Sequence, residues 1–286
     1  MWMDRRALVT GMGAMLVAAK APPVAPLPAT LVKPPRLRPG DVVGLIEPAG
    51  FTDDMFDLDL VKETIVAMGL VPRPAPHLAA RHGYLAGTDK DRAADVNAMP
   101  LLDFATIRAN PKLLIGFSDI TALHMAFAAR AGFTTIHGPN ASSSWGRFSW
   151  DGFRAVAFDG AMPTFANPVG NEDRLVPRAG HIRTFHPGKA SGRLLGGNLT
   201  VLAALMGTGW LPDFSGAILF IEDIGEAPYR IDRMLTQLAL GGVLGRLAGV
   251  VFGQCTDCGA SGPSYGGFTL SEVLQQHFGS LGIPAF

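Results

Sequence analysis

The sequence predicts an α/β fold in which helices cover a parallel sheet. Short apolar runs of strand length alternate along the chain with segments whose apolar residues recur at helical spacing. The 35 glycines and 22 prolines are spread along the 286 residues, which suits many tight connections between strands and helices. Apolar residues make up 48% of the chain and charged residues 17%, which is typical of a well-packed globular protein.

Charge and hydropathy argue against two broad classes of protein. The 24 basic side chains equal the 24 acidic ones, so the chain lacks the basic excess of a nucleic-acid-binding protein. No apolar run reaches the roughly 18 residues that are needed to span a bilayer. We therefore expect neither a nucleic-acid partner nor a membrane span.

The chain begins with the features of an export signal. Arg5 and Arg6 precede a mildly apolar stretch, residues 7–19, and the arginine pair indicates the twin-arginine route. We expect residues 1–21 to be the signal and residues 22–39, which are rich in Pro and Ala, to be an extended linker. This predicts an exported, periplasmic protein. The alternative is an amphipathic leader with no role in export.

Residues 40–145 are expected to form an N-terminal domain in which strands and helices alternate. The expected elements are a strand at 41–46, a helix with apolar residues Leu58, Val61, Ile65 and Met68, a short strand at 70–72 and a helix from Thr88 to about Met99. Thr88 can cap the last of these helices. The order is that of a parallel sheet covered by helices.

The alternation of strands and helices then breaks. Residues 100–108 have the pattern of a second short helix, and no strand separates it from the helix that ends near Met99. Since an alternating chain should return to its sheet at this point, we interpret the break as a missing strand between Met99 and Pro100. A plain helix–helix connection is the alternative.

A strand–turn–helix corner surrounds Ser118. The apolar strand 112–116 meets Ser118, and residues 120–131 follow with helical spacing. Such a corner lifts a serine hydroxyl above the sheet edge, beside the free N–H groups of the new helix, and nucleophilic serines are often presented in this way. The match to G-x-S-x-G is partial because Ile120 replaces the second glycine, and an ordinary Ser-Asp helix cap is the alternative.

The rest of the chain is expected to supply an interdomain connection and a C-terminal domain. Residues 146–188 have weak periodicity and many turn-forming residues, so we place the connection there. The domain at 189–286 should contain a helix at 199–206, a strand at 217–223, a helix at 230–238, a strand at 247–253 and a helix at 271–278. Glu222 and Asp223 end the first of these strands, where α/β proteins tend to bind ligands.

The two cysteines, Cys255 and Cys258, have C-x-x-C spacing. They follow an apparent strand and enter a Gly- and Pro-rich segment that cannot begin a helix, which disfavours a thioredoxin-type redox pair. A zinc site would need two further ligands, which nothing nearby supplies. We expect a loop disulfide or two unreactive thiols, and no metal.

Four separated segments resemble the LD-carboxypeptidases, a serine peptidase family that includes the microcin C immunity hydrolases. They are Leu114–His124 (LIGFSDITALH), His137–Pro139 (HGP), Leu195–Leu199 (LGGNL) and Phe220–Leu235 (FIEDIGEAPYRIDRML). The resemblance implies a Rossmann-like N-terminal domain with a parallel sheet, a smaller mixed α/β C-terminal domain and a site between them. It implies no cofactor, and because family members commonly dimerise, a homodimer is also considered.

The resemblance also implies a Ser-Glu-His triad. Ser118 corresponds to the nucleophile and Glu222 to the acid that orients the imidazole, and the backbone N–H of Asp119 would be an oxyanion donor. Gly116, Asn198 and His137 are candidate residues of the substrate pocket, and we expect His137 to be no more than part of its wall. His124 should pack inward.

Two parts of the family pattern are missing from this sequence. The family has an Arg-Gly-Gly-x-Gly motif before the serine strand, which would fall between Met99 and Pro100. Its triad histidine follows a Gly-Ile-Pro segment, and here the sequence stops at Phe286 before one is reached. His77, His82, His181, His186 and His277 match no family catalytic position. Loss of a general base can lower the rate on the order of 10⁴–10⁶-fold.

These observations predict an exported LD-carboxypeptidase-like protein, which removes a terminal D-amino acid from peptidoglycan peptides at an L–D bond. The missing parts predict that it is impaired. The alternative is a muropeptide-binding relative that keeps the cleft but not the chemistry. A microcin-type hydrolase is disfavoured by the export signal, because that substrate acts in the cytoplasm.

Overall fold

The computed structural model describes residues 31–96, 104–167, 175, 181–259 and 267–286. The expected signal at 1–21 lies outside these residues, as does the first part of the expected linker. The break between Met99 and Pro100 also lies outside them. Among the helices that the structure describes, none has the length and apolar character to cross a membrane.

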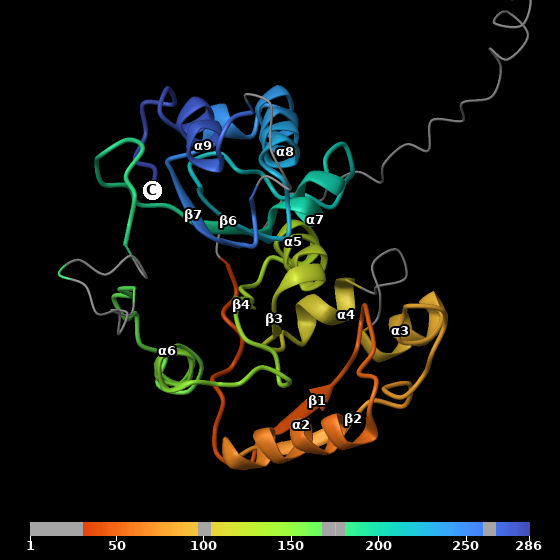
Figure 1. Ribbon diagram of the computed structural model, residues 1–286. Helices are drawn as coiled ribbons and strands as arrows, with labels where there is room; N and C mark the ends of the chain where they lie inside the picture. Colours follow the sequence, from red (N-terminus) through yellow and green to blue (C-terminus); the bar gives the residue numbers. More distant parts are fainter. Residues whose placement is uncertain (1–30, 97–103, 168–174, 176–180, 260–266) are drawn as a thin grey trace, which may run out of the picture.

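The first part of the N-terminal half is a two-stranded parallel sheet covered by a helix (Figure 1). Its elements are β1 (Val42–Leu45), α2 (Met55–Ala67) and β2 (Val71–Pro74), and Val42 pairs with Val71. Asp54 begins α2 by accepting the N–H of Phe56, a standard N-cap. A small core forms between the helix and the strands from Leu45, Leu58, Ile65, Leu70 and Leu78.

A second two-stranded parallel sheet carries the Ser118 corner. This sheet pairs β3 (Ile115–Gly116) with β4 (Ile136–His137). The helical elements of this part of the chain are α3 (Asp89–Val96), α4 (Phe104–Ala109), a 3₁₀ turn η1 (Ser118–Ile120) and α5 (Thr121–Arg130). In the described part of the chain, the strands expected to share one sheet therefore form two separate pairs, β1–β2 and β3–β4.

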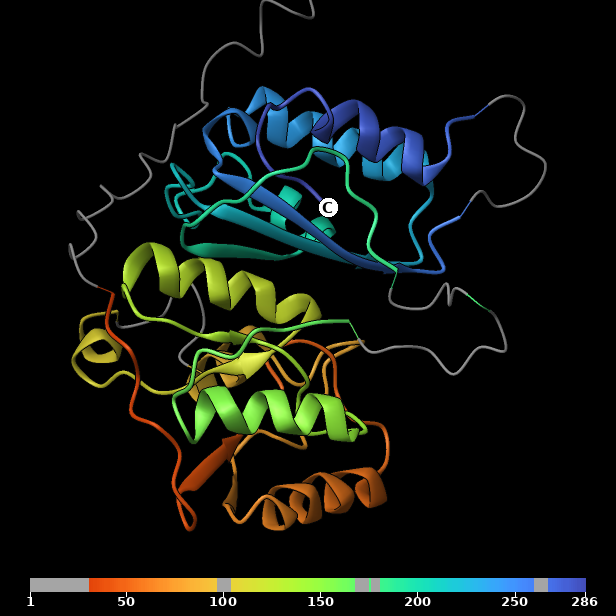
Figure 2. The same ribbon diagram turned by 90° about the vertical axis from the view of Figure 1, so that its left-hand side faces the viewer.

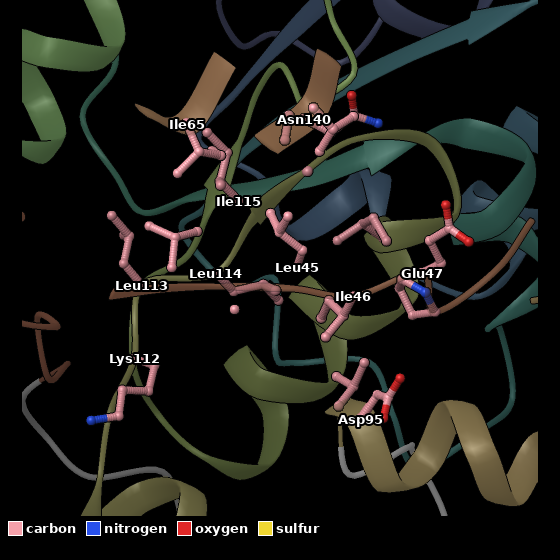
Figure 3. A pocket seen from close by; sticks show the side chains of 18 of the residues that line it. Leu45, Ile46, Glu47, Ile65, Asp95, Lys112, Leu113, Leu114, Ile115 and Asn140 are labelled. Atoms are coloured by element: carbon pink, nitrogen blue, oxygen red, sulfur yellow. The ribbon is translucent and has the colours of Figure 1, made fainter. Parts of the chain in front are cut away.

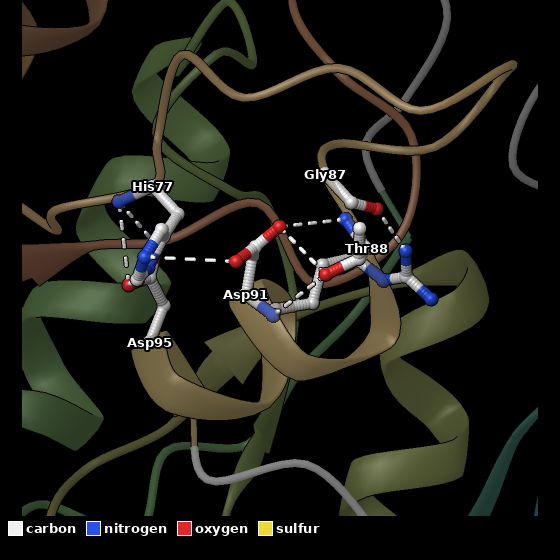
Figure 4. A network of polar contacts seen from close by, with 6 residues as sticks. His77, Gly87, Thr88, Asp91 and Asp95 are labelled. Carbon is white, nitrogen blue, oxygen red and sulfur yellow. Dashed lines mark hydrogen bonds and ion pairs between the residues drawn. The ribbon is translucent and has the colours of Figure 1, made fainter.

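A polar network fixes α3 to the loop before it (Figure 4). Thr88 and Asp91 hydrogen-bond to each other at the helix start, which lowers the pKa of the Asp91 carboxyl. One ring nitrogen of His77, Nδ1, lies 2.8 Å from Asp95 Oδ1 near the helix end. The predicted cap at Thr88 is present, and His77 serves this network.

The C-terminal half is a three-stranded parallel sheet in the order β5-β6-β7. Its elements are β5 (Leu194–Asn198), α7 (Leu199–Ala204), β6 (Ile218–Ile224), α8 (Pro228–Leu240), η2 (Leu244–Arg246), β7 (Gly249–Thr256) and α9 (Leu270–Phe278). Helices α8 and α9 lie on one face of the sheet, and α5 from the N-terminal half lies on the other (Figure 2). Met125 of α5 belongs to the same buried cluster as Leu199 and Leu219, so the two halves share a core.

Several sequence expectations need adjustment. The connection 146–188 contains a helix, α6 (Arg147–Ala157), because Phe153 and Ala157 give it a buried face. The predicted strand 112–116 is regular only at Ile115–Gly116. The helix predicted at 100–108 is described from Phe104 to Ala109.

The cysteine pair forms a disulfide. Cys255 and Cys258 are joined with their Cα atoms 5.3 Å apart, which selects the disulfide over the two free thiols. Cys255 lies near the end of β7 rather than in a loop. The disulfide therefore lies at the point where the chain leaves the end of β7.

Candidate active site

Ser118 stands in a strained turn at the end of β3. Its φ of +57° is in the left-handed region, which non-glycine residues rarely adopt. A serine forced into this conformation between a strand and a helix is the geometry of a nucleophile elbow. Ser118 is exposed at the start of η1, a turn that is closed by the hydrogen bond from the Ile120 N–H to the Phe117 carbonyl.

Gly116 permits this tight turn. A Cβ on Gly116 would lie 2.8 Å from Cγ1 of Ile120, so a side chain there would displace the isoleucine that follows the serine corner. Ile120 therefore fills the space over β3, which accounts for its presence where G-x-S-x-G has a second glycine. The carbonyl oxygen of Gly116 is also held by a hydrogen bond from α5.

His124 of α5 makes this hydrogen bond to Gly116. It is buried in α5, and its Nε2 lies 3.0 Å from the Gly116 carbonyl oxygen, so Nε2 carries the proton and donates it. Burial lowers the pKa of this imidazole, which favours its neutral form. His124 packs inward as expected, and it ties the serine strand to the serine helix.

The C-terminal end of β5 presses onto the first turn of α5. The Asn198 N–H donates to Oγ1 of the fully buried Thr121 at 2.9 Å. A Cβ on Gly197 would lie 2.4 Å from the same oxygen, so only glycine allows this approach. Thr121 is three residues after Ser118, and Asn198 pairs with Glu222 in the next strand. This contact brings the strand of Glu222 beside the serine corner.

The two carboxylates at the end of β6 have different surroundings. Asp223 is buried, and it accepts the N–H and hydroxyl of Thr200 at 3.0 and 2.9 Å and the N–H of Ile224 at 2.9 Å. These bonds fasten the end of β6 to the first turn of α7. The Asp223 carboxylate thus has its hydrogen-bond donors within the protein. Glu222, in contrast, has a buried oxygen without a hydrogen-bond partner.

Glu222 lies next to His137. Its Oε1 is 3.7 Å from Nε2 of the histidine and is buried without a hydrogen-bond partner, as is Nδ1 of the histidine. Burial raises the pKa of Glu222, and the neighbouring Asp223 charge adds to this effect. Burial, with a smaller effect of His124, lowers the pKa of His137 to about 4.

The proximity of His137 to Glu222 was not predicted. The sequence placed His137 in the pocket wall, because β4 and β6 belong to different halves of the chain and no local pattern relates them. Among the described residues, Ser118 makes no hydrogen bond to a histidine. The other histidines with described polar contacts serve the fold; His277, for example, pairs with Asp232 at 2.7 Å.

A cavity of about 1020 Å³ opens beside Ser118 in the N-terminal half (Figure 3). Gly116, Ser118 and Asp119 are among its lining residues, whereas Glu222, Asn198 and His137 are not. Of the three predicted pocket residues, Gly116 therefore lines this cavity, and Asn198 and His137 do not. Ser118 lines this cavity, whereas the Glu222–His137 pair lies outside its lining.

Comparison with known proteins gives the chain a family. Residues 191–286 match the model of the LD-carboxypeptidase C-terminal domain, and residues 97–138 match that of the N-terminal domain. A probable murein peptide carboxypeptidase of Bacillus subtilis is 34% identical, over 88% of this chain and 84% of its own. A putative carboxypeptidase of Streptomyces coelicolor is 37% identical, over 89% of this chain and 86% of its own.

Solved structures show the same fold. The microcin C7 self-immunity protein MccF superposes with a TM-score of 0.75 at 22% identity, over 88% of each chain. A muramoyltetrapeptide carboxypeptidase from Oxalobacter formigenes superposes with a TM-score of 0.67 at 27% identity, over 85% of this chain and 86% of its own. With its mixed α/β architecture, its parallel sheets and these matches along most of its length, the chain belongs to the LD-carboxypeptidase family.

Proposed function

We propose that this chain is a serine-type LD-carboxypeptidase that releases a terminal D-amino acid from peptidoglycan-derived peptides. The observation that carries the proposal is Ser118, held at φ +57° between β3 and the first turn of α5. The relatives named as murein peptide carboxypeptidases support a peptidoglycan peptide as the substrate class. No cofactor and no metal enter the mechanism.

Ser118 is the nucleophile in this mechanism. Its Oγ attacks the carbonyl carbon of the L–D bond, and the backbone N–H of Asp119 donates to the oxyanion that forms. One such donor typically contributes about 2.7–4 kcal/mol to lowering the barrier. Collapse of this intermediate breaks the C–N bond and releases the D-amino acid through its amine, and water then hydrolyses the acyl-enzyme to free the serine and the shortened peptide.

Removal of the proton from the Ser118 hydroxyl requires a general base. Glu222 would orient an imidazole that accepts this proton and returns it to the leaving amine. Among the described residues His137 lies nearest to Glu222 by ion-pair distance, but a pKa of about 4 makes it a poor base near neutral pH. We therefore expect this chain to turn over slowly.

The test is release of D-alanine from a muramoyl tetrapeptide. We expect slow release by the chain, abolished in Ser118→Ala and kept in Ser144→Ala, which removes a hydroxyl elsewhere in the N-terminal half. Release that persists in Ser118→Ala would assign the chemistry to another residue or to a contaminant and would overturn the proposal.

The second candidate is a non-catalytic muropeptide-binding protein. It is favoured by one observation: Ser118 has no hydrogen bond to a histidine in the described part of the chain. Calorimetric titration with the tetrapeptide separates the two. Binding without release by the wild-type chain supports the binding protein, and binding with Ser118-dependent release supports the peptidase.

Export to the periplasm and dimerisation are further parts of the proposal. Replacement of Arg5 and Arg6 by lysine should retain the protein in the cytoplasm if the twin-arginine route is used, and cell fractionation measures this. Sedimentation of the purified protein distinguishes a homodimer from a monomer. Neither outcome alters the assignment of Ser118.

A further inference from the structure

A β-bulge in β7 lies directly opposite Glu222. The parallel ladder between β6 and β7 (Figure 1) is regular as far as Phe252, and it resumes at Cys255 with its register shifted. Two residues of β7, Gly253 and Gln254, therefore stand opposite the single residue Glu222 of β6. Because a bulge bends its strand and changes the direction of nearby side chains, the shape of β7 at this point bears on Glu222.

Gly253 brings the bulge against the side chains around Glu222. A Cβ on Gly253 would lie 3.5 Å from the Cβ of Glu222 and 3.3 Å from Cε2 of Phe220. The ring of Phe220 in turn packs on His137, with 5.2 Å between the ring centroids. A change in the shape of the bulge would therefore be felt by the Glu222–His137 pair.

The disulfide closes a small ring immediately after the bulge. Cys255 follows Gln254 directly, and its side chain packs against the large buried cluster of the C-terminal half. Within the ring, Asp257 has a φ of +55°, in the left-handed region that non-glycine residues rarely adopt. The Cys258 N–H donates to the Cys255 carbonyl at 3.3 Å. The covalent bond thus holds β7 in a tight turn as the strand ends.

This ring also holds the end of β6. The Gly225 N–H, directly after β6, donates to the carbonyl of Thr256 at 2.8 Å, and Thr256 lies inside the ring. The opposite edge of β6 is held at Asp223 by the N–H and hydroxyl of Thr200. Opening of the ring should therefore loosen one edge of this strand end without detaching the strand.

The effect of the disulfide should be local. It joins residues only three positions apart, and the stabilisation that a disulfide gives to a whole fold grows with the length of the loop that it closes. The two cysteines are half-buried, and Thr256 and Asp257 between them are exposed. A small dithiol can therefore reach the bond while the fold is intact.

We propose that the Cys255–Cys258 disulfide positions Glu222 through the bulge at Gly253 and Gln254, and that its reversible reduction by a dithiol lowers the catalytic rate. A thiolate of the dithiol attacks one cysteine sulfur and breaks the S–S bond, and the second thiolate resolves the mixed disulfide. The dithiol becomes a disulfide and loses two electrons. Cys255 and Cys258 each gain one electron and one proton. The effect on catalysis rests on the proposed function, whereas the positioning does not.

Amide hydrogen exchange tests the positioning without any activity measurement. The oxidised chain is compared with the same chain in dithiothreitol, and alkylation followed by mass measurement establishes that both thiols are free. We expect exchange at the Gly225 amide to become about tenfold faster on reduction. The Ala248 amide, which donates to Ala217 at 2.8 Å just before β7, should be unaffected. Unchanged exchange at Gly225 would overturn the proposal, and so would equal acceleration at Ala248, because the disulfide would then stabilise the whole fold.

The carboxyl group of Glu222 can be followed in the same two samples. Burial raises its pKa in the oxidised chain, and looser surroundings should bring the pKa back toward its ordinary value. Titration of the Glu222 carboxyl carbon by NMR measures this change. An identical titration curve in the two redox states would contradict the positioning of this side chain by the disulfide.

Release of D-alanine from the muramoyl tetrapeptide tests the catalytic consequence. Reduction should lower kcat about tenfold and leave KM unchanged, because Glu222 orients the general base and does not hold the peptide. Reoxidation should restore the rate. A higher KM with unchanged kcat would overturn the proposal, since the disulfide would then shape the peptide-binding surface instead.

Two variants separate the disulfide from other effects of the reductant. The double variant Cys255→Ser with Cys258→Ser should have the low kcat of the reduced chain and should not respond to dithiothreitol. Thr256→Ala keeps the ring and the backbone acceptor of Gly225, so it should keep both the oxidised rate and the response. An oxidised-like rate in the double variant would contradict the proposal. Faster Gly225 exchange and a shifted Glu222 titration, without Ser118-dependent release in either state, would support the positioning and count against the proposed function alone.

Discussion

Glu222 and Asp223 are neighbours at the end of β6 with opposite surroundings. Asp223 receives hydrogen bonds from Thr200 and Ile224, whereas Glu222 has a buried oxygen with no partner. The sequence identified the pair but could not divide its roles, because the two donors of Thr200 come from α7, which follows a different strand. The division gives a direct prediction for single substitutions.

Asp223→Asn should destabilise the protein by about 1–3 kcal/mol, because an amide nitrogen cannot accept the N–H and O–H groups that now converge on the carboxylate. Glu222→Gln should change stability by less than about 0.5 kcal/mol, since burial already disfavours its charged form. Urea unfolding of the two isosteric variants measures the difference. A larger loss in Glu222→Gln would reverse the assignment of the structural carboxylate.

His137 gives the protein a predictable response to pH. Its pKa falls from 6.5 to about 4 on folding, so between these values the unfolded chain binds more protons than the folded one. The free energy of unfolding should therefore fall as the pH is lowered from about 6.5 to about 4, by at most about 3 kcal/mol from this group. Glu222, whose folded pKa is raised above 4.5, contributes with the opposite sign over the interval from 4.5 up to its raised pKa, which overlaps the range of His137.

The measurement is urea unfolding of the wild-type chain and His137→Gln at pH 7 and pH 5. The variant also loses the packing of the ring on Phe220, at 5.2 Å between centroids, so it should be less stable at both pH values. Its loss of stability between pH 7 and pH 5 should nevertheless be smaller. His124 continues to contribute in both proteins, because burial lowers its pKa as well. An equal pH dependence in the two proteins would show that His137 is solvated.

At the scale of elements, local patterns predicted most of the strands and helices, but not their pairing. The serine corner, the strand of Glu222 and the capped start at Thr88 are present because each is specified within about ten residues. Helix α6 was missed, although the ring contacts of its buried Phe153 are local, with Trp145, Trp150 and Phe158. The split of the N-terminal strands into two sheets is a tertiary result, which local patterns do not encode.

The close contact between β5 and the first turn of α5 holds the strand of Asn198 against the serine helix. Gly197→Ala should destabilise the protein by about 2 kcal/mol or more, because a Cβ would lie 2.4 Å from Thr121 Oγ1 and φ is +146°. Gly207→Ala is the matched control: its φ is +80°, but a Cβ there would meet open space, so it incurs backbone strain of about 1 kcal/mol without a clash. Thermal unfolding of both variants tests this. Equal losses would mean that the close approach to Thr121 is not tight.

At the scale of the whole molecule, helix α5 belongs to the N-terminal half by sequence and packs against both halves, since Phe127 joins a buried cluster with Phe133. Met125 joins the large buried cluster of β5, α7 and β6, while the strands β1 and β2 have only the small cluster around Leu58. Ser118 lies where these two bodies meet. Its position is therefore set by the larger core through Thr121 and Asn198, and only weakly by β1 and β2.

This arrangement predicts two separable effects of core truncation. Leu202→Ala removes a fully buried side chain from the large cluster, and Leu58→Ala removes a buried one from the small cluster; each should cost about 2–5 kcal/mol in its own region. Hydrogen exchange should rise across β5, β6 and α5 in Leu202→Ala, but only across β1, β2 and α2 in Leu58→Ala. If Leu58→Ala exposed α5 as strongly as Leu202→Ala does, the halves would unfold as one unit. The serine corner would then depend on the whole molecule instead of on its C-terminal core.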